Sequence, residues 1–132
     1  MIDVRTSNVR SGMISSPVIT PRTTVATALK LLREHDVAAL PVCDGGRYVG
    51  LVHEKGLLRL TPSEIATLDV YELRDWLDRL TVSRIIESVP AIASDASLED
   101  AAVLMRTGRH EVLPVLDAGR LAGLLPWTAL LP

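Results

Sequence analysis

The chain of 132 residues is long enough for one ordinary domain or two very small ones, and 48% of its residues are apolar. With 23% charged residues and no apolar run near the roughly 18 residues of a membrane span, the composition excludes a disordered chain and a membrane partner. Fourteen basic and sixteen acidic residues are interspersed, so no basic block predicts a nucleic-acid partner.

The first part of the chain predicts a short strand, a helix and a hairpin, in that order. Residues 18–20 are a candidate strand, and Thr24 is a candidate N-cap for a helix with apolar residues at i, i+3, i+4 and i+7. Two apolar runs, 37–42 and 47–52, are joined by Asp44-Gly45-Gly46, which is typical of a hairpin turn. A further helix is predicted to begin at residues 57–60.

Residues 61–80 predict a helical linker. Thr61-Pro62-Ser63-Glu64 matches a capping box with proline at the first helical position. Asp69 offers a second helix start, and the residues after it have amphipathic spacing. We therefore expect an ordered helical insert between the flanking segments.

The end of the chain repeats its beginning. Leu40-Pro41-Val42 recurs 73 residues later as Leu113-Pro114-Val115, and this offset aligns residues 9–58 with 82–131 without a gap. The second copy again predicts a strand at 91–93, a helix capped by Ser97, and hairpin strands at 112–116 and 120–125. A long gapless match of this kind indicates two copies of one structural unit.

These features together resemble a tandem pair of cystathionine-β-synthase (CBS) domains, a Bateman module. Each copy has an apolar-Pro-Val strand, an Asp-x-Gly-Arg turn and a Gly-Leu-apolar strand end. The helical linker further resembles the bacterial acetoin-utilisation type. The resemblance implies an α/β fold of two pseudo-twofold-related repeats packed sheet to sheet, with CBS domain 1 at 8–60, the linker at 61–80 and CBS domain 2 at 81–132. It also implies a non-catalytic regulatory module that forms a homodimer.

The resemblance implies a ligand as well. CBS pairs bind adenosine compounds such as AMP, ADP, ATP or S-adenosylmethionine in clefts between the two repeats, with apolar residues and backbone around the adenine. The matching positions here are Val18, Ile19, Thr20, Ala39, Leu40 and Pro41 in the first copy, and Ile92, Ala93, Val112, Leu113 and Pro114 in the second.

This sequence lacks most of the polar residues that hold ribose and phosphate in the family. The family has a hydroxyl residue for phosphate and an aspartate for ribose, but the first copy has His53 and Gly56 at these positions and the second has Pro126 and Ala129. Lys55 matches the family's basic position. Each missing charge-assisted hydrogen bond costs about 1.5–3 kcal/mol.

Three interpretations remain open. The module senses an adenosine ligand through a non-standard set of donors, His53, Lys55 and Arg22; in that case the first site is favoured, because Pro126 cannot donate a hydrogen bond. Alternatively, it is a dimerising scaffold that has lost nucleotide binding. Finally, it is a regulatory fragment of a longer protein, since the sequence stops where the last helix should continue.

Other residues predict no catalytic or metal chemistry. No nucleophile elbow, phosphate loop or paired-cysteine motif is present, so we expect no enzyme activity. The three histidines lack metal-ligand spacing, and Cys43 is expected to be a buried apolar side chain. Pro41 and Pro114 are expected at a sheet edge or site margin, because proline lacks a backbone donor. The N-terminus lacks a secretory signal pattern, which predicts a cytoplasmic protein.

Overall fold

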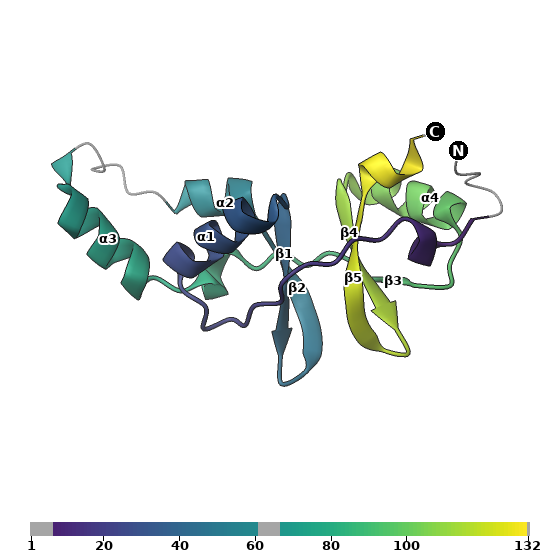
Figure 1. Ribbon diagram of the computed structural model, residues 1–132, viewed down its shortest axis with the longest axis horizontal. Helices are drawn as coiled ribbons and strands as arrows, with labels where there is room; N and C mark the ends of the chain where they lie inside the picture. Colours follow the sequence, from purple (N-terminus) through teal and green to yellow (C-terminus); the bar gives the residue numbers. More distant parts are fainter. Residues whose placement is uncertain (1–6, 61–66, 132) are drawn as a thin grey trace. The chain divides into compact units, whose positions relative to one another are not determined.

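The computed structural model describes residues 7–60 and 67–131, and its elements group into two units (Figure 1). Unit 1 contains the described parts of Met1–Ser16, Gly46–Tyr48 and Val89–Pro132, and unit 2 contains those of Pro17–Gly45 and Val49–Ser88. The unit boundaries cut across the two sequence repeats. The capping box predicted at 61–64 lies outside the described residues.

The elements of both units follow the predicted order. The first repeat and the linker form helix α1 (Val25–His35), strands β1 (Ala39–Asp44) and β2 (Arg47–His53), and helices α2 (Glu54–Arg59) and α3 (Val70–Arg79). The second repeat forms β3 (Ile92–Ala93), α4 (Leu98–Gly108), β4 (Val112–Asp117) and β5 (Arg120–Pro126). The described residues also form short 3-10 helices, among them η1 (Val9–Ser11), η3 (Val82–Ile85) and η4 (Trp127–Leu130).

The repeat predicted from sequence is confirmed in the two hairpins. Strands β1 and β4 have the same succession of buried and exposed residues, and so do β2 and β5. The helix caps also match: the Thr27 amide donates to Thr24 Oγ1 at 3.2 Å, and the Asp100 amide donates to Ser97 Oγ at 3.0 Å. Equivalent capping and turn residues therefore produce the same helix and hairpin in both repeats.

Three predicted elements differ in detail. Residues 18–20 form only one parallel bridge, between Ile19 and Val42, whereas the equivalent β3 pairs two residues with β4. Helix α2 begins at Glu54 instead of at 57–60, because His53 already ends the strand as its N-cap. In the second repeat, the equivalent segment forms the 3-10 helix η4.

Of the two places predicted for Pro41 and Pro114, the sheet edge is wrong, whereas the site margin stays a prediction. Strand β4 is central in the order β3-β4-β5, and β1 is likewise flanked by β2 and by the bridge at Ile19. The parallel partner is very short, since β3 pairs only with Val115 and Leu116. In β1, pairing on that side begins at the carbonyl of Pro41, which accepts from the Ile19 amide, so the missing N–H of the proline lies just before the paired stretch.

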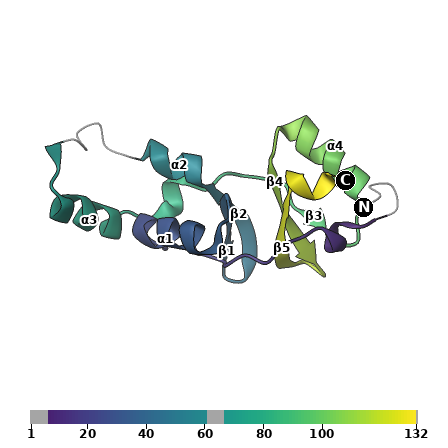
Figure 2. The same ribbon diagram turned by 45° about the horizontal axis from the view of Figure 1, so that its top comes forward.

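Helix α3 packs beside α1, as both views show (Figure 2). Its N-cap is Asp69, which accepts a hydrogen bond from the Glu72 amide at 2.8 Å, and this bond lowers the pKa of the Asp69 carboxyl. The pKa of Asp69 is therefore lower in the folded chain than in the unfolded chain. The hydrogen bond stabilises the fold at neutral pH, and this stabilisation is lost as the pH falls through the folded pKa. Leu77 and Leu80 pack against the core of unit 2.

The segment at the start of each repeat, which we call its leader, packs on the other repeat. Leader 1 is residues 7–15, and leader 2 is residues 80–88. In unit 1, the Val9 amide donates to Ala96 O at 2.8 Å, and the Leu98 amide donates to Ser7 O at 3.0 Å. Ile14 and Leu124 exchange two backbone hydrogen bonds of 2.8 and 3.0 Å. Leader 1 is therefore an integral part of unit 1.

The same contacts recur in unit 2 at positions shifted by 73. The Val82 amide donates to Thr23 O at 2.9 Å, and the Val25 amide donates to Leu80 O at 2.8 Å. Glu87 and Leu51 exchange two backbone hydrogen bonds of 2.8 and 2.9 Å. The two leaders are thus exchanged reciprocally between the repeats.

The hairpin turns differ in one residue that we expect to affect stability. Ala118 has a φ of 51°, where the first repeat has Gly45 with a φ of 59°. A left-handed conformation is strained for alanine, so Ala118→Gly is expected to raise the free energy of unfolding by about 0.5 kcal/mol, after the entropic cost of glycine. Urea unfolding measures this change.

Gly45→Ala is the matched control. It should lower stability by a similar amount, because a Cβ at Gly45 meets nothing within 4 Å and only the backbone conformation matters. A loss of stability in Ala118→Gly would contradict the explanation.

Candidate functional site

The apolar residues predicted for the first site lie close together in unit 2. The Ile19 amide donates to Pro41 O at 3.0 Å, and the Cys43 amide donates to Ile19 O at 2.9 Å, which places residues 18–20 along β1. Val18 is 52% exposed, whereas Leu40 is fully buried in the core. The exposed side chains of Val18 and Thr20, together with backbone, are therefore what this segment can offer a ligand.

The residues predicted for the second site lie on the paired strands β3 and β4 of unit 1. Ile92 pairs with Val115 and Ala93 with Leu116 in the parallel ladder of β3 and β4. Leu113 is fully buried, and Val112, Pro114 and Ile92 are buried as well, while Ala93 is exposed.

The predicted polar donors occupy different surroundings. Lys55 is an exposed residue of the first turn of α2. The exposed Arg22 guanidinium lies 3.9 Å from the Asp44 carboxylate, at the end of β1. The Thr20 hydroxyl oxygen accepts from the Arg22 amide at 3.2 Å. Arg22 and Lys55 therefore come from separate elements of unit 2, the turn before α1 and the start of α2.

His53 has an acidic neighbour that the sequence analysis did not identify. Its Nδ1 lies 3.1 Å from Oε2 of Glu87, a residue of leader 2. The side chains are 24% and 46% exposed. Nδ1 is buried and, within the described residues, makes no hydrogen bond, so this close contact is not aligned as one. The sequence signal was available, since the repeat aligns Glu87 with the apolar Ile14.

Gly56, at the family's ribose position, faces the same leader. A Cβ built on Gly56 would lie 3.7 Å from Ile85 Cβ and 3.9 Å from Oε1 of Glu87. These are ordinary contact distances, so leader 2 borders the space beside Gly56. In unit 1 the equivalent contact is apolar, because a Cβ on Gly12 would lie 3.0 Å from Ala129 Cβ.

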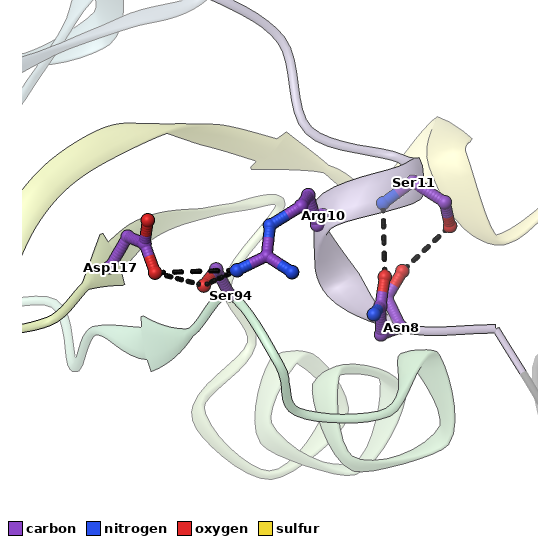
Figure 3. A network of polar contacts seen from close by, with 5 residues as sticks. All are labelled: Asn8, Arg10, Ser11, Ser94 and Asp117. Carbon is purple, nitrogen blue, oxygen red and sulfur yellow. Dashed lines mark hydrogen bonds and ion pairs between the residues drawn. The ribbon is translucent and has the colours of Figure 1, made fainter.

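A second polar cluster, in unit 1, joins leader 1 to the hairpin (Figure 3). Arg10 donates to Ser94 Oγ at 2.9 Å and lies 3.3 Å from the Asp117 carboxylate, while Ser94 donates to Asp117 at 2.9 Å. Ser94 is only 3% exposed, and its hydroxyl is satisfied by these bonds. The charges of the cluster neutralise each other, so it acts in holding leader 1 in place.

An open hollow of about 460 Å³ in unit 1 is lined by Ala102, Met105, Arg106, Arg109, His110, Glu111, Trp127 and Leu130. The described part of the chain contains no group of three or more acidic, His or Cys side chains that could hold a metal ion. In residues 7–60 and 67–131, no helix has the length and apolar character needed to cross a membrane.

Cys43 is half-buried, so the expectation of a fully buried thiol is wrong. It lies near the end of β1, where the strand leaves the core. Burial raises the pKa of the Cys43 thiol, which makes it a weak nucleophile at neutral pH.

Two named proteins are similar in sequence to most of this chain. The chain is 28% identical to the CBS domain-containing protein YhcV of Bacillus subtilis over 121 residues, which cover 90% of this chain and 79% of YhcV. It is 32% identical to the chloroplastic CBS domain-containing protein CBSX2 of Arabidopsis thaliana over 128 residues, covering 82% of this chain and 54% of CBSX2. Both names describe CBS-domain proteins.

Solved structures agree with this relationship. The crystal structure of CBSX2 in complex with AMP has a TM-score of 0.71 at 31% identity, covering 92% of this chain and 91% of that one. A putative acetoin utilization protein (AcuB) from Vibrio cholerae has the same fold, with a TM-score of 0.75 at 19% identity and coverage of 94% and 87%. The CBS domain profile matches residues 7–63 and 82–131, and the chain therefore belongs to the CBS domain family as a tandem CBS pair.

Proposed function

We propose that the chain is a non-catalytic regulatory module that senses an adenosine ligand, of the class of AMP, ADP, ATP and S-adenosylmethionine, at its first repeat. The observation that carries this proposal is the 31% identity to CBSX2, whose structure was solved in complex with AMP. The exposed Val18 and Thr20 are the proposed adenine surface, and Lys55 is the proposed phosphate contact. Binding would favour one arrangement of the module over another.

The second repeat favours a different role. Pro126 and Ala129 leave it without the polar groups that hold phosphate and ribose in the family. We therefore propose that it binds no nucleotide and serves as a scaffold, with one ligand per chain.

We also propose that the protein is a cytoplasmic homodimer. The exposed apolar side chains of Val103 on α4 (47%) and Trp127 on η4 (49%) are suited to burial against a second copy. Sedimentation equilibrium tests this: a dimer is expected, and a monomer at high micromolar concentration would contradict it.

Thermal unfolding with AMP, ADP, ATP and S-adenosylmethionine tests ligand sensing. A ligand at 100 times its dissociation constant should add about 2.7 kcal/mol to the free energy of unfolding and raise Tm accordingly. Calorimetric titration should then give one site per chain. If none of the four raises Tm at millimolar concentration, the sensing proposal is wrong and the scaffold alternative is favoured.

The only two lysines of the chain provide a matched pair of variants. Lys55→Ala should weaken AMP binding about tenfold, because it removes a charge-assisted contact to phosphate, and should leave adenosine binding unchanged. Lys30→Ala should have no effect on either ligand, since Lys30 lies on α1 beside Glu34, at 3.8 Å. Equal effects of both variants would argue against a phosphate contact at Lys55.

A further inference from the structure

We propose that Glu87 of leader 2 supplies the ligand-binding carboxylate that the first repeat lacks at Gly56, and that it accepts hydrogen bonds from a vicinal diol of the ligand. This inference rests on the proposed function of unit 2. It assigns part of the first-repeat site to a residue near the start of the second repeat.

The position of the Glu87 carboxylate carries the proposal. Its Oε1 lies 3.9 Å from where a Cβ on Gly56 would be. The oxygens of an aspartate lie two bonds beyond its Cβ, so Oε1 borders the space that an aspartate at this position would occupy. An aspartate at 56 would bring two carboxylates together, which like-charge repulsion disfavours. The structure therefore has one carboxylate here, supplied by a different segment.

The backbone of Glu87 is held firmly. Glu87 and Leu51 exchange two hydrogen bonds of 2.8 and 2.9 Å, which fix leader 2 against β2. Oε2 faces His53 Nδ1 at 3.1 Å, and the side chain is 46% exposed. One oxygen thus contacts the imidazole, and the carboxylate remains accessible to a ligand.

The other unit serves as an internal comparison. At the positions equivalent to His53, Gly56 and Glu87, unit 1 has Pro126, Ala129 and Ile14. Ile14 and Leu124 exchange the same two backbone hydrogen bonds, so the backbone arrangement is retained while every polar group is absent. The histidine and the glutamate therefore occur together in one unit and are both missing from the other, as expected for groups that act together.

The chemistry of a carboxylate identifies the part of the ligand it contacts. A carboxylate only accepts hydrogen bonds, and two neighbouring hydroxyls can donate to its two oxygens. A phosphate would be repelled. The 2′- and 3′-hydroxyls of a ribonucleoside meet this requirement, whereas a 2′-deoxyribonucleoside has only one of the two donors.

The test compares AMP with 2′-deoxy-AMP by calorimetric titration of the full chain. The unaltered protein should bind AMP about tenfold more tightly than 2′-deoxy-AMP. Glu87→Gln keeps the size of the side chain but removes the charge, so it should weaken AMP binding about tenfold and bring the two affinities within about twofold. Glu87→Asp keeps the charge on a shorter side chain and should therefore retain part of the preference for AMP over 2′-deoxy-AMP. Glu99→Gln, an exposed first-turn residue of α4, is the matched control and should leave both affinities unchanged.

The outcomes separate this inference from the proposed function. If Glu87→Gln binds AMP with unchanged affinity and unchanged preference over 2′-deoxy-AMP, the role of Glu87 is wrong while nucleotide sensing stands. If both affinities fall equally, Glu87 has only a structural role and the inference is overturned. If the unaltered protein binds neither nucleotide, the inference and the proposed function are both wrong.

Discussion

Leu113→Ala is expected to lower the free energy of unfolding by about 3 kcal/mol. Leu113 lies in the central strand β4 and is 0% exposed. Its truncation removes buried apolar surface and leaves a cavity, which the closely packed neighbours fill only in part. Leu40→Ala, at the equivalent position of β1 and also 0% exposed, should have an effect of similar size. Urea unfolding followed by circular dichroism measures both changes.

Leu58→Ala provides the matched control. Leu58 is 63% exposed, so the same truncation should change stability by less than about 0.5 kcal/mol. A loss in Leu113→Ala no larger than in Leu58→Ala would show that β4 is not the centre of a packed core.

Gly123→Ala and Gly50→Ala are expected to destabilise the protein by about 2–3 kcal/mol each, through the exchanged leaders. A Cβ on Gly123 would lie 2.5 Å from Ile14 O, and a Cβ on Gly50 would lie 2.5 Å from Glu87 O. Backbone atoms cannot move aside as a side-chain end can, so each leader has to shift away from its strand. Hydrogen exchange at the amides of Ile14 and Glu87 should accelerate in the respective variant, more than at the amides of the hairpins.

Gly56→Ala is the contrasting change. A Cβ there meets its neighbours at 3.7 Å or more, within a helix where alanine is favoured over glycine. This variant should keep or raise stability, by up to about 1 kcal/mol. If Gly123→Ala were equally harmless, leader 1 would not be packed against β5 as described.

The candidate site could be predicted only in part from the sequence. The apolar segments at 18–20 and 39–41 were identified because their motif recurs at the same offset in both copies. The contact between His53 and Glu87 was not, since it depends on a leader that crosses to the other repeat. The central position of Pro41 and Pro114 was also missed, because the candidate strands at 18–20 and 91–93 do not by themselves indicate which strand they pair with.

By itself, the sequence determined the elements of this protein and their duplication. Caps at Thr24, Asp69 and Ser97 and the hairpin turns depend on residues a few positions apart, so local chemistry is sufficient to predict them. The tertiary structure alone decided which leader packs on which repeat. The exchanged pairing consists of contacts between residues far apart in the chain, such as Glu87 with Leu51 and His53, and local patterns carry no information on which distant segments meet.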